Sequence, residues 1–158
     1  MFNIGDKVVY PMHGAGVIEA IEEKEILGER QKYYVVRIPI GDMKVMIPLN
    51  NIKEVGVREV AGPEEIAEVL NILKAEKSAM STNWNRRYRA NMEKIKSGNI
   101  FQIAEVVRNL ALREKEKGLS TGERKMLENA KNILASEIVL SKSIDEDEAM
   151  EFIEGVFE

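Results

Sequence analysis

The chain has 158 residues, of which 44% are apolar and 32% are charged, with a net charge of -4 and no cysteine. This composition is typical of a globular protein with one medium or two small domains. It excludes a disulfide framework and a thiolate metal site. No apolar run reaches the roughly 18 residues of a membrane span, and the N-terminus lacks a signal-peptide pattern. We therefore expect a cytoplasmic protein without a membrane partner.

The net acidity hides a segregated charge distribution. Residues 74–98 contain seven basic and two acidic side chains, whereas residues 137–158 contain eight acidic and one basic. A local basic patch, more than the net charge, decides whether a protein can bind a phosphate backbone. The acidic remainder predicts weak intrinsic affinity for DNA.

Residues 1–60 predict a small β domain. Short β-branched and aromatic runs alternate with turns that contain glycine or proline. Leu27 and Gly28 are expected at a hairpin tip. The expected strands are 8–10, 17–22, 33–38, 43–48 and 52–55. Five short strands with tight turns favour a compact barrel.

Residues 61–158 predict about five helices, so the fold class is α+β. Pro63 suits a first helical position, and apolar residues at three- and four-residue spacing follow it. Further helices are expected over 84–96, over 100–117, from a Ser120-x-x-Glu123 capping box to about residue 140, and after Asp145 as a cap. Gly98 and Gly118 are expected to end the second and third helices.

The helix predicted over 84–96 has an unusual first turn. It begins with the only tryptophan, Trp84, and carries Arg86, Arg87 and Arg89 beside Tyr88. Arginine side chains and free N–H groups at a helix start bind phosphates. An indole beside them can act as an apolar wedge or a stacking surface for a base. This pattern favours contact with nucleic acid.

The same helix has an alternative interpretation. Trp84, Tyr88, Met92 and Ile95 follow spacings of four, four and three, which is typical of a helix face buried in a core. Trp84 would then be a hydrophobic anchor and the arginines a solvated surface. Exposure of the Trp84 ring distinguishes the two interpretations.

The residues for catalysis or metal binding are poorly placed. The only histidine, His13, lies in a predicted turn without a nucleophile motif nearby. Gly14 and Gly16 lack the third glycine of a dinucleotide loop. The acidic residues 145–148 lack the glycine of a calcium loop, and helix capping explains them more simply. We expect neither an enzyme nor a cofactor, metal or small-molecule substrate.

Several motifs, in order along the full length, resemble the CarD/CdnL family of bacterial transcription regulators. They are Phe2-x-x-Gly5-Asp6-Lys7-Val8-Val9-Tyr10-Pro11-x-His13-Gly14, Val55-Gly56-Val57-Arg58, Asn83-Trp84-x-Arg86-Arg87-Tyr88-x-Ala90-Asn91, Ala104-Glu105-Val106-Val107-Arg108-Asn109-Leu110 and Gly118-Leu119-Ser120-x-Gly122-Glu123. The resemblance implies a Tudor-like five-stranded domain (residues 1–60) that docks on the RNA polymerase β subunit. It also implies a helical DNA-binding domain (residues 61–158).

In that family the residue matching Trp84 is a minor-groove wedge at the upstream edge of the transcription bubble, where it stabilises the open complex. The DNA-contacting residues are therefore expected to be Trp84, Asn85, Arg86, Arg87, Tyr88, Arg89 and Lys94. Polymerase contacts are expected at Lys24 and at Met46, where the family has a basic residue; neighbouring Lys44 is the expected substitute for the missing charge.

A protein-interaction adaptor of polymerase or repair complexes, without DNA contact, is the alternative function. An exposed strand edge in residues 1–60 can recruit a partner by strand addition, with the helices acting only as a spacer. The arginines around Trp84 favour the DNA-contacting regulator, because a spacer does not need them.

Overall fold

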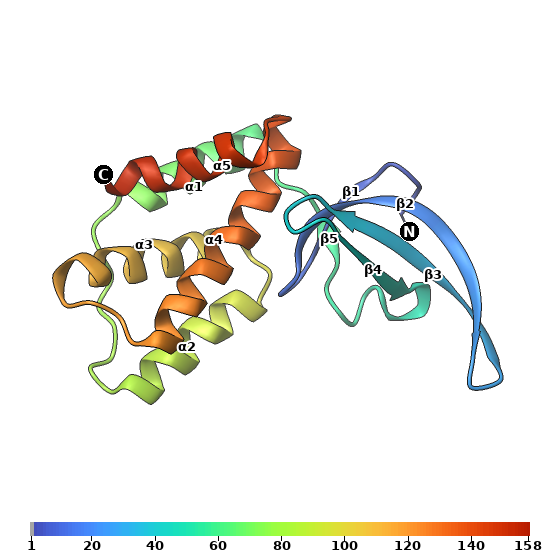
Figure 1. The fold of residues 1–158 in the computed structure, drawn as a ribbon, viewed down its shortest axis with the longest axis horizontal. Helices are drawn as coiled ribbons and strands as arrows, with labels where there is room; N and C mark the ends of the chain where they lie inside the picture. The colour runs from blue at the N-terminus through green and yellow to red at the C-terminus, as the bar shows by residue number, and fades with distance from the viewer. Residues whose placement is uncertain (1) are drawn as a thin grey trace.

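The structure, a computed structural model, describes residues 2–158. Five strands precede five α-helices, which confirms the α+β fold class (Figure 1). The strands are β1 (Lys7–Tyr10), β2 (Gly14–Ile26), β3 (Glu29–Ile38), β4 (Met43–Pro48) and β5 (Arg58–Glu59). The helices are α1 (Pro63–Lys74), α2 (Trp84–Lys96), α3 (Ile100–Glu116), α4 (Thr121–Lys142) and α5 (Glu146–Glu154). We call residues 2–60 the β module and residues 61–158 the helical module.

The strands form one antiparallel sheet in the order β4-β3-β2-β1-β5. Strands β2 and β3 are longer than predicted and form a hairpin that extends away from the helices (Figure 1). Its two-residue turn has φ of 54° at Leu27 and 80° at Gly28. Two left-handed residues match the twist of the flanking strands. The charged residues along this hairpin hid its length from the sequence pattern.

The strand predicted over 52–55 is wrong. After β4 the chain forms a 3-10 turn over Leu49–Asn51, and the backbone N–H of Val55 donates to the carbonyl of Asn51 at 3.0 Å. Ile52 and Val55 are three residues apart, so a helical turn places both against the β core, as an extended strand would not. The last strand is instead β5, which pairs with β1.

The predicted helices are confirmed, with ends that differ by at most about two residues. Side chains at four helix starts accept hydrogen bonds from backbone N–H groups; they belong to Asn83, Asn99, Ser120 and Asp145. Such caps satisfy donors that the helix itself leaves free. No helix within residues 2–158 is long and apolar enough to span a bilayer.

Each module has a hydrophobic core, and a third cluster joins them. The helical core includes Leu110, Leu134 and Ile138, and the β core includes Tyr34 and Ile47. The joining cluster consists of Val9, Ala15 and Leu140. The two modules therefore pack against each other through apolar contacts and are not connected by the linker alone.

Candidate nucleic-acid interface

The start of α2 is fixed by its cap. The side chain of Asn83 accepts a hydrogen bond from the backbone N–H of Arg86 at 3.0 Å. Asn83 itself has extended backbone geometry, so the helix begins sharply at Trp84. The loop before it, residues 75–83, is mostly polar and brings the chain to this point without a regular element. The tryptophan therefore lies at the edge of the helical module.

The Trp84 ring is neither sealed in the core nor free in solvent. It is 41% exposed. Its indole stacks on Tyr88 with ring centroids 4.9 Å apart and an interplanar angle of 19°. Its Nε1 donates to the Ser120 hydroxyl, the cap of α4, at 2.9 Å. A partly exposed indole in one held orientation is suited to contact a partner.

The buried face of α2 differs from the apolar stripe considered above. Its buried residues are Arg87, Asn91 and Ile95, whereas Tyr88 and Met92 are only partly buried. The buried face of α2 therefore does not include Trp84. The core-anchor interpretation holds for Ile95 and fails for the tryptophan.

Arg87 requires a correction. Its guanidinium is 4% exposed and forms a two-bond ion pair with Glu123 of α4, with Nε–Oε2 at 2.8 Å and Nη2–Oε1 at 3.1 Å. The hydrogen bond from Arg87 lowers the pKa of Glu123, against the effect of burial. The same bond raises the pKa of Arg87. A phosphate cannot reach this guanidinium, so we assign Arg87 a positioning role within the helical module.

The other expected DNA-contacting residues on α2 are exposed to different degrees. Asn85, Arg86 and Arg89 are exposed. Because a helix turns about 100° per residue, Arg86 and Arg89 lie on one face, and Trp84 is about 140° from Arg89. Lys94 is half-buried and paired with Glu105 of α3 at 3.1 Å. Arg86, about 160° around the helix axis from Trp84, and Arg89 are thus the exposed cations of α2 closest to Trp84 in the sequence, and they lie on the opposite face of the helix.

The expected polymerase contacts lie in two places on the β module. Lys24 is on the projecting hairpin and pairs across the ladder with Gln31. Lys44 and Met46 are on the edge strand β4, where Lys44 also forms an ion pair with Glu19 at 3.3 Å. The β3 partners of Lys24 and Lys44 are six residues apart, Gln31 and Arg37, which is roughly 20 Å along a strand. These side chains can serve one extended surface but not one compact pocket.

Sequence reasoning missed that Ser120 and Glu123 bind the first turn of α2, Ser120 at Trp84 and Glu123 at Arg87. Ser120 was expected only as a helix cap, and Glu123 only as the reciprocal member of a capping box. The Ser120 hydroxyl does accept from the Glu123 N–H at 3.2 Å, but the Glu123 carboxylate turns to Arg87. The family motif in residues 118–123 was the sequence signal that could have indicated a role for this segment beyond helix capping.

The alternative sites have structural explanations. The His13 ring stacks on Tyr10 with centroids 4.2 Å apart, within the β1–β2 turn. Asp145 accepts from the backbone N–H of Glu148 at 2.8 Å and so caps α5. Within residues 2–158, no group of three or more His, Asp or Glu side chains is arranged to hold a metal ion.

The sequence matches two family models that together span most of the chain. Residues 2–61 match the CarD-like/TRCF RID domain, and residues 68–154 match the CarD C-terminal domain. A relative described as the putative transcription factor YdeB of Bacillus subtilis (strain 168) is 47% identical over 152 residues, which is 96% of this chain and 99% of the relative. The solution NMR structure of the N-terminal domain of Myxococcus xanthus CarD is 32% identical and covers 37% of this chain and 79% of that one, with a TM-score of 0.33.

The two family models and the transcription-factor relative together identify the chain as a CarD-like regulator of transcription. The chain belongs to the CarD family. Residues 2–61, which hold the five-stranded sheet, are its CarD-like/TRCF RID domain, and the C-terminal domain of that family lies in the all-helical part of the chain.

Proposed function

We propose that the β module docks on the β subunit of RNA polymerase while the start of α2 contacts promoter DNA at the upstream edge of the transcription bubble. The protein thereby stabilises the open complex. The observation that carries the proposal is the partly exposed indole of Trp84 at the start of a basic helix. Membership in the CarD family supports a role in transcription initiation.

The indole acts as a wedge in the minor groove. Unstacking a base step costs a few kcal/mol within a duplex, and much of that cost is absent where the strands are already melted. Trp84 is held by Tyr88 and Ser120, so its insertion loses little conformational freedom. An ordered ring at a bubble edge thus favours the melted state.

Arg86 and Arg89 bind phosphates on the face of α2 opposite the wedge, and Asn85 adds a polar contact from the same exposed turn. Few contacts suffice because docking on polymerase raises the effective concentration of the helical module to around millimolar. About 1.4 kcal/mol of stabilisation shifts the promoter-opening equilibrium roughly tenfold. The acidic net charge then limits binding to bulk DNA.

The docking surface comprises Lys24 on the hairpin and Lys44 with Met46 on β4. An edge strand offers unpaired backbone groups to a partner, and β4 is at an edge of the sheet. Charge reversal by Lys24→Glu or Lys44→Glu in the full chain is expected to weaken polymerase binding. Pull-down with holoenzyme measures this, and Lys53→Glu, on the exposed turn before β5, is the control of equal charge change.

The central experiment compares open-complex decay with wild-type protein, Trp84→Ala and Trp84→Phe at matched occupancy of polymerase. We expect Trp84→Ala to shorten the lifetime while the fold and polymerase binding persist. Trp84→Phe keeps an aromatic wedge but loses the bond to Ser120, so its effect is expected to be intermediate. Equal open-complex lifetimes for wild type and Trp84→Ala would exclude the wedge. The alternative function, a protein-interaction adaptor without DNA contact, would then be favoured, and the edge strand β4 is the feature that supports it.

A further inference from the structure

The boundary between the two modules is crossed by an ion pair between a partly buried arginine and a buried glutamate. The carboxylate of Glu137, on α4, is only 2% exposed. Arg58 of β5 donates to it twice, from Nη1 to Oε2 and from Nη2 to Oε1, each at 2.7 Å. The backbone N–H of Ala61 donates to Oε2 at 2.7 Å. One carboxylate thus receives three donors from the chain that leads out of the β module.

Arg58 also reaches the helix that carries Trp84. Its Nε donates to the carbonyl of Gly98, at the end of α2, at 2.9 Å. Pro11, in the β1–β2 turn, packs on the same glycine, where an added Cβ would lie 3.0 Å from the Pro11 Cγ. The β module therefore contacts the C-terminal end of α2, while Trp84 projects from the N-terminal end.

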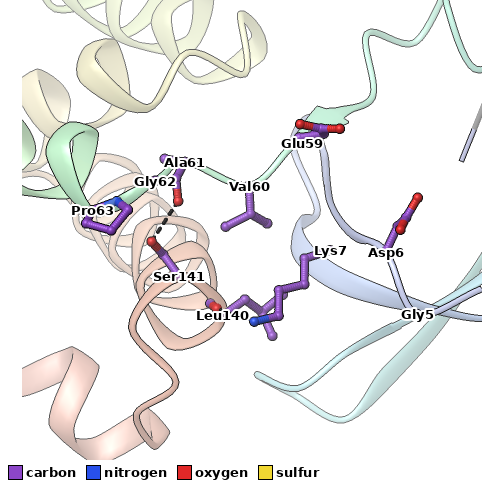
Figure 2. Close-up of a pocket in the computed structure, with 10 residues that line it drawn as sticks. All are labelled: Gly5, Asp6, Lys7, Glu59, Val60, Ala61, Gly62, Pro63, Leu140 and Ser141. Atoms are coloured by element: carbon purple, nitrogen blue, oxygen red, sulfur yellow. Dashed lines mark hydrogen bonds between the residues drawn. The ribbon is translucent and has the colours of Figure 1, made fainter. Parts of the chain in front are cut away.

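Further hydrogen bonds lie along the same side of α4. The Ser136 hydroxyl accepts from the Ala15 N–H at 2.8 Å, and the Lys7 Nζ donates to the Leu140 carbonyl at 2.9 Å. The Ser141 hydroxyl donates to the Ala61 carbonyl at 2.6 Å (Figure 2). The bonds of Lys7 and Ser141 border an open cavity of about 410 Å³ at the junction, toward which Lys7 extends from β1.

Such contacts are more specific than the usual boundary between domains, across which relative motion is the default. Rotation of the β module away from α4 would separate the Glu137 carboxylate from both donors of Arg58, and the Ala15 N–H from the Ser136 hydroxyl. An uncompensated buried charge costs several kcal/mol, so only one relative orientation satisfies these groups. The Arg58–Glu137 pair therefore restricts the angle between the modules more than it stabilises the fold of either module.

We propose that Arg58 and Glu137 form a latch that fixes the angle between the β module and the helical module, and that Glu137 is a positioning residue for Trp84. The inference rests on the proposed function, because the fixed angle matters when one module is docked on polymerase and the other must meet DNA. A fixed angle removes the entropic cost of searching for the bubble edge. Loss of the latch leaves the docked helical module in many orientations, only some of which place the indole on DNA.

The test uses two variants of the latch and one control. Glu137→Gln keeps the shape, but its amide nitrogen is a donor facing the donors of Arg58. Arg58→Lys keeps the charge but cannot form two bonds to Glu137 and a third to Gly98. Glu116→Gln removes an ion pair with Lys77 of 2.6 Å that lies wholly within the helical module. The chain has no cysteine, so Glu29→Cys and Lys125→Cys, both at exposed positions, allow one spin label on each module.

We expect Glu137→Gln and Arg58→Lys to broaden the distribution of distances between the labels, while Glu116→Gln leaves it narrow. If the productive orientation falls to about one tenth of the population, the apparent equilibrium constant for contact between the helical module and promoter DNA falls about tenfold. Polymerase binding stays unchanged. An unchanged distance distribution in both latch variants overturns the latch. Unchanged open-complex lifetime, where Trp84→Ala shortens it, overturns the positioning role. If Trp84→Ala is itself without effect, the proposed function fails, and the distance distribution alone decides the latch.

Discussion

Trp84 and Ser120 are joined by a hydrogen bond of 2.9 Å between the indole Nε1 and the hydroxyl that caps α4, across 36 positions in the sequence. Ser120 is in turn bonded to Glu123, whose carboxylate holds Arg87 of the tryptophan helix. The exposed ring and the buried ion pair thus belong to one network between α2 and α4. The orientation of the indole depends on residues that make no contact with DNA themselves.

Substitution of Ser120 by alanine is expected to release the indole. The variant loses the Nε1 bond and the cap of α4, with a cost of about 1 kcal/mol for the cap. Because Trp84 is the only tryptophan, its fluorescence reports the change directly. We expect emission at longer wavelength and lower anisotropy.

Asn99→Ala is the control for this variant. Asn99 caps α3, where its side chain accepts from the N–H groups of Phe101 and Gln102, with no bond to Trp84. It should lose similar stability without a change in emission. Equal spectra for all three proteins would show that the Ser120 bond does not hold the ring in solution.

The Arg87–Glu123 pair is expected to contribute strongly to the stability of the helical module. Removal of one member by Arg87→Met or Glu123→Gln leaves its partner buried and unpaired, at about 3–5 kcal/mol. The half-exposed pair Lys94–Glu105 provides a comparison, since Glu105→Gln should cost about 1 kcal/mol or less. Urea unfolding of the full chain measures both. Similar costs for the two pairs would contradict the buried geometry.

The same pair predicts loss of stability in acid. The pKa of Glu123 is lowered in the folded state by the hydrogen bond from Arg87, so the unfolded chain binds a proton at higher pH than the folded chain. The stabilisation is therefore complete above the unfolded pKa, about 4.3, and is lost as the pH falls through the lower folded value. In Glu123→Gln this contribution is absent. Urea titrations at several pH values should show the difference between wild type and variant shrinking only below about pH 4.3.

Local sequence signals were sufficient for most of the elements and insufficient for the pairing of charges. Ser120 and Asp145 indicated helix starts because a cap acts within three residues. Arg87 looked like its neighbours Arg86 and Arg89, since the partner that buries it is 36 residues away. For the same reason the latch was not predicted, although its motif, residues 55–58, was recognised. Long-range partners decide which of several similar side chains is exposed.

The exposed arginines make a prediction about salt. Each phosphate contact adds roughly 0.9 to the slope of log affinity against log salt concentration. Arg86→Gln and Arg89→Gln are each expected to lower the slope by about 1 for the polymerase–promoter complex, relative to wild type. The charge of Arg87 is matched by Glu123, so loss of that arginine should leave the slope unchanged in any variant that stays folded. Unchanged slopes for Arg86→Gln and Arg89→Gln would favour the adaptor function.

Gly14 makes the close approach between β2 and α4 possible. It has φ of +113°, and a Cβ there would lie 2.8 Å from the Ser136 Oγ. That hydroxyl also accepts from the Ala15 N–H and donates to the Ile133 carbonyl, so it cannot move away without breaking one of these bonds. Gly14→Ala should therefore disturb the boundary between the modules as well as strain the backbone.

Gly28→Ala separates the two effects, because Gly28 has φ of +80° but nothing within 4 Å of the added Cβ. Left-handed strain alone should cost about 1–2 kcal/mol in either variant. The clash with Ser136 should add about 1–3 kcal/mol in Gly14→Ala. Urea unfolding gives the two costs, and the spin-label distances between the modules should broaden for Gly14→Ala only. Equal costs and equal distances would mean that β2 does not rest on α4 in solution, and the angle between the modules would then depend on the latch and on the Lys7–Leu140 hydrogen bond.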